Sequence, residues 1–114
     1  MKTEDKELLI KDISARIPYY LQVEIKAKIP FINIIYSIDI DGSCEINEDL
    51  YNIDKIKPYL FPLSSMTEEQ KKEFNSFIIK APWKLIDWFN KNHFDYRELI
   101  SMGLANDATG LNIY

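Results

Sequence analysis

The side chains best suited to catalysis are those of His93 and Asp95, which lie two residues apart in the 114-residue chain. A carboxylate that orients an imidazole supports proton transfer at many active sites. No motif links a serine or cysteine nucleophile to this pair, and Asp95 also suits the start of a following helix. We therefore interpret His93 as part of a helix end and Asp95 as a helix cap, and we predict no catalytic residue.

Acidic side chains gather in the middle of the chain, with no lysine or arginine among them before Lys55. They are Asp39, Asp41, Glu45, Glu48, Asp49 and Asp54. Hard cations bind such oxygens, but Gly42 comes too early for a calcium loop, so we predict no metal and no cofactor. The cluster is interpreted as an exposed acidic turn, with contact to a basic partner as the functional alternative.

Cys44 is the only cysteine, so the chain forms no internal disulfide. Its acidic neighbours disfavour the thiolate, and we expect a small, buried or half-buried residue rather than a reactive one. The polar N-terminal residues show no signal peptide, which favours the cytoplasm. No apolar run approaches the roughly 18 residues that a membrane span needs.

Two tryptophans lie in a segment rich in aliphatic and aromatic residues. At helical spacing such a face usually packs in a core. Tryptophan is also enriched at binding hot spots, and a small domain leaves part of a broad apolar face for a partner or a second copy. The candidate protein-binding residues are Trp83, Trp88, His93 and Tyr96, with Asp39, Asp41 and Glu45 of the acidic turn.

The composition is that of an ordinary folded domain, 46% hydrophobic and 28% charged, with 13% aromatic residues to fill one core. The net charge of −4 argues against general nucleic-acid binding, which needs a basic field. A local stripe of lysine and arginine on one helical face leaves a nucleic-acid-associated accessory protein as the alternative function.

Helical periodicity predicts a first helix over residues 3–16. Leu9 and Ile13 lie on its apolar face, and Asp12 is placed on the polar face. Pro18 ends the helix, because the residue before a proline avoids helical torsions.

Alternation of apolar and polar residues then predicts strands over residues 19–27 and 32–40, with Ile35 out of phase. The Asp41-Gly42 turn returns the chain as a third strand over 43–46, so that residues 31–47 form a hairpin.

Residues 48–56 are predicted to be a short helix or turn. A Thr-Glu-Glu-Gln capping box opens a helix over 67–80, which is expected to bury Phe74, Phe77 and Ile78. Pro82 begins the next helix, and a second capping pattern at Asp95 begins another that Gly103 ends.

These elements predict an α+β fold with an N-terminal helix, a small antiparallel sheet of two to three strands, and about three helices packed on one face of that sheet. Residues 1–105 form the single domain. Residues 106–114 are expected to be a mobile tail unless Leu111, Ile113 and Tyr114 dock.

Three segments of the second half carry a resemblance. They are Lys57–Glu69 (KPYLFPLSSMTEE), Asp87–Arg97 (DWFNKNHFDYR) and the Gly103–Ala105 ending. In content and order they resemble a group of small uncharacterised proteins encoded by gut Bacteroidales genomes and by their phages or mobile elements. The resemblance implies a phage-associated setting and no particular activity. We therefore expect a small non-enzymatic protein-interaction or regulatory protein, whose partner is another protein or a second copy of the chain.

Overall fold

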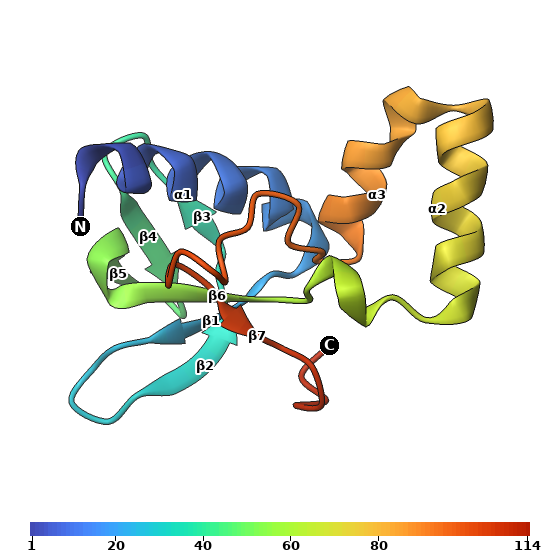
Figure 1. Cartoon of the computed structure of the whole chain (residues 1–114). Coiled ribbons are helices and arrows are strands. Elements are labelled where there is room, and N and C mark those ends of the chain that lie inside the picture. Colours follow the sequence, from blue (N-terminus) through green and yellow to red (C-terminus); the bar gives the residue numbers. More distant parts are fainter.

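The computed structural model describes residues 1–114 and shows an α+β protein with two small sheets (Figure 1). One sheet has the strand order β2-β1-β6-β7 and the other has the order β3-β4-β5. The strands are β1 (Gln22–Ile25), β2 (Phe31–Ile34), β3 (Ser37–Ile38), β4 (Ser43–Ile46), β5 (Asp49–Asn52), β6 (Ile56–Leu60) and β7 (Asn106–Asp107). The α-helices are α1 (Thr3–Arg16), α2 (Glu68–Lys80) and α3 (Leu85–Lys91). The predicted class and N-terminal helix are confirmed, whereas the single sheet of two to three strands is wrong.

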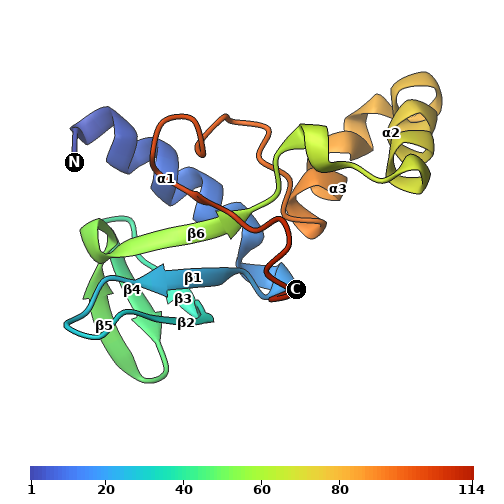
Figure 2. The ribbon, with the colours of Figure 1, turned by 60° about the horizontal axis from the view of Figure 1, so that its bottom comes forward.

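Helix α1 lies across the two sheets and closes the main core (Figure 2). Its buried residues are Leu9, Asp12, Ile13 and Arg16, a stripe with helical spacing. The fully buried Asp12 corrects our placement of this residue on the polar face. The core residues are Leu9, Ile13, Leu21, Val23, Ile25, Ile35, Cys44, Ile46, Ile53, Ile56, Leu60, Leu99 and Ala105.

The predicted strand over residues 32–40 is divided between the two sheets. Strand β2 pairs antiparallel with β1, and β3 pairs antiparallel with β4. Ile35 lies at the crossing, where its N–H donates to the carbonyl of Leu21 and its side chain is buried. The residue that was out of phase is therefore the core residue, and Ile40, on the face expected to be buried, is 95% exposed.

The β4–β5 connection explains why residues 48–56 are not a short helix or turn as predicted. Asn47 and Glu48 both have positive φ, at 52° and 69°. Two successive residues of this kind form the tight turn that suits the twist of a hairpin. The chain therefore returns at once as β5, and a short 3-10 helix, Ile53–Lys55, leads into β6.

Strand β2 is an edge of the first sheet. Gln22 pairs with Ile34, and the Gln22 N–H points away from β2 to the Tyr114 hydroxyl at 2.9 Å. By antiparallel geometry, the backbone groups of Ile34 then point outward from the sheet. The outward N–H of Ile34 donates to Oδ1 of Asn33 at 2.8 Å.

Helices α2 and α3 form an antiparallel pair that projects from one end of the molecule (Figures 1 and 2). The capping box at Thr67 and Gln70 is present as predicted. However, the pair does not lie on a sheet face, and α2 has no buried residue. The expected burial is only partial for Phe74 and Phe77 and is wrong for Ile78, which is exposed. The third predicted helix is a series of turns, because Glu98 takes a φ of 60°. No helix is long and apolar enough to cross a bilayer.

Residues 106–114 dock on the rest of the protein, which is the condition under which we expected them not to be mobile. Strand β7 pairs in parallel with β6, and the Ala108 N–H donates to the Leu60 carbonyl at 2.8 Å. The Tyr114 hydroxyl donates to the Tyr59 carbonyl at 2.8 Å. The segment that was expected to be mobile without such contacts is thus attached to the first sheet.

We predict that Gly42→Ala lowers the free energy of unfolding by about 2–4 kcal/mol. Gly42 has a φ of 91°, and an added Cβ would lie 2.9 Å from side-chain atoms of both Ile53 and Lys6. Gly110→Ala is the matched control, because its φ is 79° but its Cβ would meet nothing within 4 Å. Urea unfolding of both variants measures the difference, and equal losses would contradict the steric part of the prediction.

Candidate functional site

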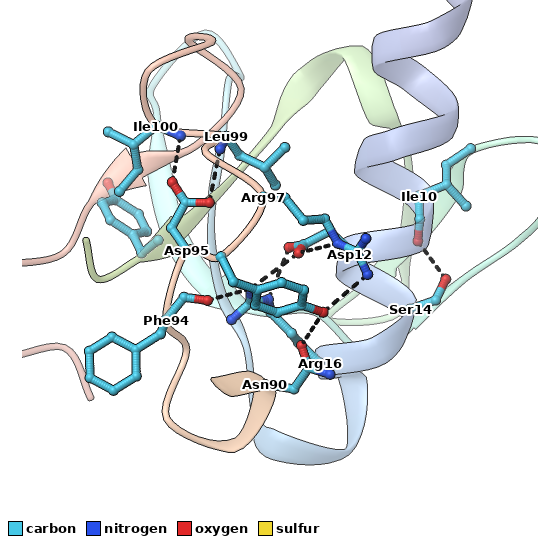
Figure 3. Close-up of polar contacts among 12 residues, drawn as sticks. Ile10, Asp12, Ser14, Arg16, Asn90, Phe94, Asp95, Arg97, Leu99 and Ile100 are labelled. Atoms are coloured by element: carbon cyan, nitrogen blue, oxygen red, sulfur yellow. Dashed lines mark hydrogen bonds and ion pairs between the residues drawn. The ribbon is translucent and has the colours of Figure 1, made fainter. Parts of the chain in front are cut away.

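The buried joint between α1 and the segment after α3 is an ionic cluster (Figure 3). Asp12 accepts from Nε and Nη2 of Arg16 at 2.9 and 3.1 Å, and from Nε of Arg97 at 3.1 Å. Arg16 also donates to the Phe94 carbonyl at 2.6 Å. The side chains of Asp12 and Arg16 are completely buried. The cluster therefore joins two distant parts of the chain and has no access to a dissolved substrate.

Tyr96 contacts this joint through its hydroxyl group and its ring. Its hydroxyl accepts from Arg97 and donates to Asn90, both at 3.0 Å. The Arg16 and Arg97 guanidinium carbons lie 5.4 and 4.8 Å from its ring centroid, within cation–π distance. Tyr96 was proposed as a binding residue, and the structure places it in an internal network.

The two tryptophans have opposite surroundings. Trp88 is 8% exposed, stacks on Phe94 at 5.4 Å and donates its indole N–H to Glu73 at 2.9 Å. It belongs to a second, aromatic core between the helices. Trp83 is 74% exposed, in the 3-10 turn Pro82–Lys84 between α2 and α3. Packing in a core, the favoured interpretation for both, is confirmed for Trp88 and wrong for Trp83.

The turn between α2 and α3 carries an exposed apolar surface, which we call the hairpin tip. Its large exposed side chains are Ile78, Ile79, Trp83 and Ile86. Residues 75–86 include Lys80 and Lys84 and no carboxylate, and the exposed Asp87 follows directly, whereas the whole chain has a net charge of −4. The tip is therefore apolar and locally basic.

The acidic turn lies at the β3–β4 connection. Asp39 and Asp41 are exposed, and Oδ1 of Asp41 accepts from the Ser43 N–H at 2.9 Å, which lowers the Asp41 pKa. Glu45 is half-buried and accepts from the Ser37 hydroxyl at 3.3 Å. Burial, together with the charges of Asp39 and Asp41, raises the pKa of the Cys44 thiol to about 12, so this thiol stays protonated at neutral pH.

His93 lies in the wall of a cavity of about 660 Å³, which we call the His93 cavity. The histidine is 5% exposed, has a φ of 58° and stacks on the Tyr114 ring at 4.0 Å. Burial and the nearby Arg16 charge lower its pKa to about 4, against a small opposing effect of the Tyr19 backbone. Its Nδ1 is buried without a hydrogen-bond partner. Asp95 does not orient it, because that carboxylate accepts from the Leu99 and Ile100 amides.

The proposed binding residues do not form one site. Trp83 lies at the hairpin tip, Trp88 is buried in the second core, and Tyr96 is half-buried against the Asp12 joint. His93 lines the cavity, and the carboxylates lie on the acidic turn. Sequence reasoning missed the joint at Asp12 and Arg16, although their spacing on the apolar stripe of α1 was a usable signal. It named docking of Tyr114 only as a condition, because no local pattern indicates which residues Tyr114 contacts.

Comparison with known protein families, with curated proteins and with solved structures finds no match. No group of three or more histidine, cysteine, aspartate or glutamate side chains is placed to hold a metal ion.

We predict that Asp12→Asn lowers the free energy of unfolding by about 3–5 kcal/mol, because it leaves the buried Arg16 charge without its partner. Glu68→Gln is the matched control, since it breaks the exposed pair with Lys71 at 3.3 Å and is expected to lose less than about 1 kcal/mol. Urea unfolding at neutral pH gives both values. Comparable losses in the two variants would show that the buried joint is energetically unimportant.

We predict that protonation of His93 destabilises the fold. Because its folded pKa is below the ordinary 6.5, its contribution is complete above pH 6.5 and is lost as the pH falls toward the folded value of about 4. The loss over that window is about 3 kcal/mol.

The free energy of unfolding is measured as a function of pH for the wild type and for His93→Gln. The carboxylates contribute equally to both profiles, so the difference between the profiles isolates the contribution of His93. A proton NMR titration of His93, the only histidine, provides the second readout. A midpoint near pH 6.5 in the folded protein would contradict the prediction.

Proposed function

We propose that the chain is a small non-enzymatic interaction protein that binds another protein through the hairpin tip. The observation that carries the proposal is the 74% exposure of Trp83, on a helical pair whose other tryptophan is buried. Ile79 is 79% exposed in the same turn region, so two large apolar side chains face solvent there. Exposed apolar clusters of this kind characterise protein contact sites, and tryptophan contributes more than most residues to binding energy.

The charge of the tip selects the kind of partner. Lys80 and Lys84 flank Trp83 with no neighbouring carboxylate between residues 75 and 86. The complementary surface is an apolar groove with an acidic rim. This proposal commits to such a partner protein, and the resemblance of the second half of the chain supports a phage or mobile-element setting, in the cytoplasm of the host.

The architecture supports the tip as the contact element. The second core anchors the helical pair at its base through Trp88, Phe89 and Phe94, so the tip is presented on a packed support. A rigid presentation reduces the conformational entropy that is lost on binding. The acidic turn offers fewer apolar anchors and is the weaker candidate surface.

We predict that Trp83→Ala weakens partner binding by about thirtyfold or more, which corresponds to a hot-spot residue. A photoreactive amino acid at position 86 captures the partner from a lysate of a Bacteroidales host, and the purified partner is then titrated with each variant. Tyr36→Ala is the matched control, because Tyr36 is an equally exposed aromatic residue, at 73%, outside the tip. Binding should also weaken with added salt.

Three outcomes would contradict the proposal. The partner could bind Trp83→Ala and the wild type equally, or it could lack an acidic rim. Sedimentation could instead show a dimer that Trp83→Ala dissociates, which would assign the tip to a second copy of the chain. Binding to duplex DNA at low salt that Lys80→Glu abolishes would favour the nucleic-acid-associated alternative.

A further inference from the structure

We infer that the His93 cavity binds a nucleotide, a small molecule with a heteroaromatic ring and a phosphate group. This site is independent of the hairpin tip, because the cavity lies at the opposite end of the helical pair. Its walls come from the N-terminal turn of α2, the C-terminal end of α3, the residues before and within β1, and the C-terminal segment. Its volume of about 660 Å³ falls within the range of small-molecule sites, about 300–1,000 Å³.

The lining is rich in flat rings. The aromatic members are Tyr19, Tyr20, Phe61, His93, Phe94 and Tyr114. Tyr20 is 72% exposed, so its ring is available to a ligand. Aromatic faces of this kind stack on nucleobases, at about 1–3 kcal/mol per base.

The charge of the lining favours an anion. Lys91 is its only charged side chain, and no aspartate or glutamate side chain lines the cavity although the chain as a whole is acidic. Behind the wall, the buried Arg16 charge adds to the lowering of the His93 pKa that burial causes, and it partly opposes the rise that burial causes in the Tyr114 pKa, so its positive field reaches this region. The N-terminal turn of α2, with Thr67 and Gln70 in the lining, adds a favourable dipole, which the exposed carboxylates of Glu68 and Glu69 outside the lining oppose in part.

Two amide side chains leave polar atoms for the edge of a base. Oε1 of Gln70 accepts from the Thr67 N–H, which leaves the Gln70 amide nitrogen as a donor. The Asn92 amide nitrogen donates to the Trp88 carbonyl, which leaves the Asn92 oxygen as an acceptor. Together with the buried Nδ1 of His93, which has no partner, the cavity provides the donors and acceptors that heteroaromatic recognition requires.

The test is an NMR titration of the purified full chain with AMP, adenosine and inorganic phosphate as separate probes. AMP should bind most tightly and shift the resonances of Tyr20, Lys91, His93 and Tyr114. Lys91→Ala should weaken AMP binding about tenfold or more, since it removes a charge-assisted contact, and should leave adenosine binding unchanged. Tyr20→Ala should weaken both AMP and adenosine.

Lys28→Ala is the matched control, because it removes an exposed lysine outside both the cavity and the hairpin tip. The same spectra verify that each variant is folded. The inference is overturned if AMP shifts no cavity resonance at millimolar concentration, if Lys28→Ala and Lys91→Ala lose AMP affinity equally, or if adenosine or phosphate alone binds as tightly as AMP. Because none of these probes involves the hairpin tip, failure here leaves the proposed protein contact intact.

Discussion

The rest of this structure depends on the ion pairs of one buried carboxylate, that of Asp12. It lies between two guanidinium groups, and the residues that supply them, Arg16 and Arg97, are 81 positions apart in the chain (97 − 16). Charged groups without solvent are stable only when each has a partner, so the three side chains determine one another's positions. Through Arg16 the joint also binds the Phe94 carbonyl, and Phe94 belongs to the aromatic core of the helical pair.

Two cores of different kinds therefore meet at this joint. The main core is aliphatic and lies between α1 and the two sheets, whereas the second is almost entirely aromatic. The second core is small and lies at the base of the helical pair, so it cannot cover the turn at the far end. This limit explains why Trp88 is buried and Trp83, five residues earlier, is not. Trp83 is exposed because the α2–α3 pair shares only a small core with the rest of the protein.

Local signals in the sequence were sufficient where neighbouring residues alone determine the structure. The helix over residues 3–16, the strand over 43–46 and the capping box at Thr67 all agree with the structure. Each depends on side-chain periodicity or on a hydrogen bond within one turn.

The failures share a different cause, since distant contacts overrule local preference. Asp95 resembles a helix cap in the sequence, but no helix follows it. Arg97 instead binds Asp12, and Glu98 takes a positive φ that a helix does not allow. Strand β5 depends on the Asn47-Glu48 turn, which lacks the glycine that usually marks such hairpins. The exposed surface at the hairpin tip was equally hard to predict from the sequence, because whether a tryptophan is covered depends on the extent of the whole core.

The open edge of β2 has a consequence for the behaviour of the protein at high concentration. Unpaired backbone donors at a sheet edge recruit strands from other molecules and thereby promote aggregation. Here the amide of Ile34, which would otherwise be such a donor, is already occupied by the Asn33 side chain. One asparagine thus occupies one of the outward donors of this exposed edge and lowers the tendency of the protein to polymerise through it.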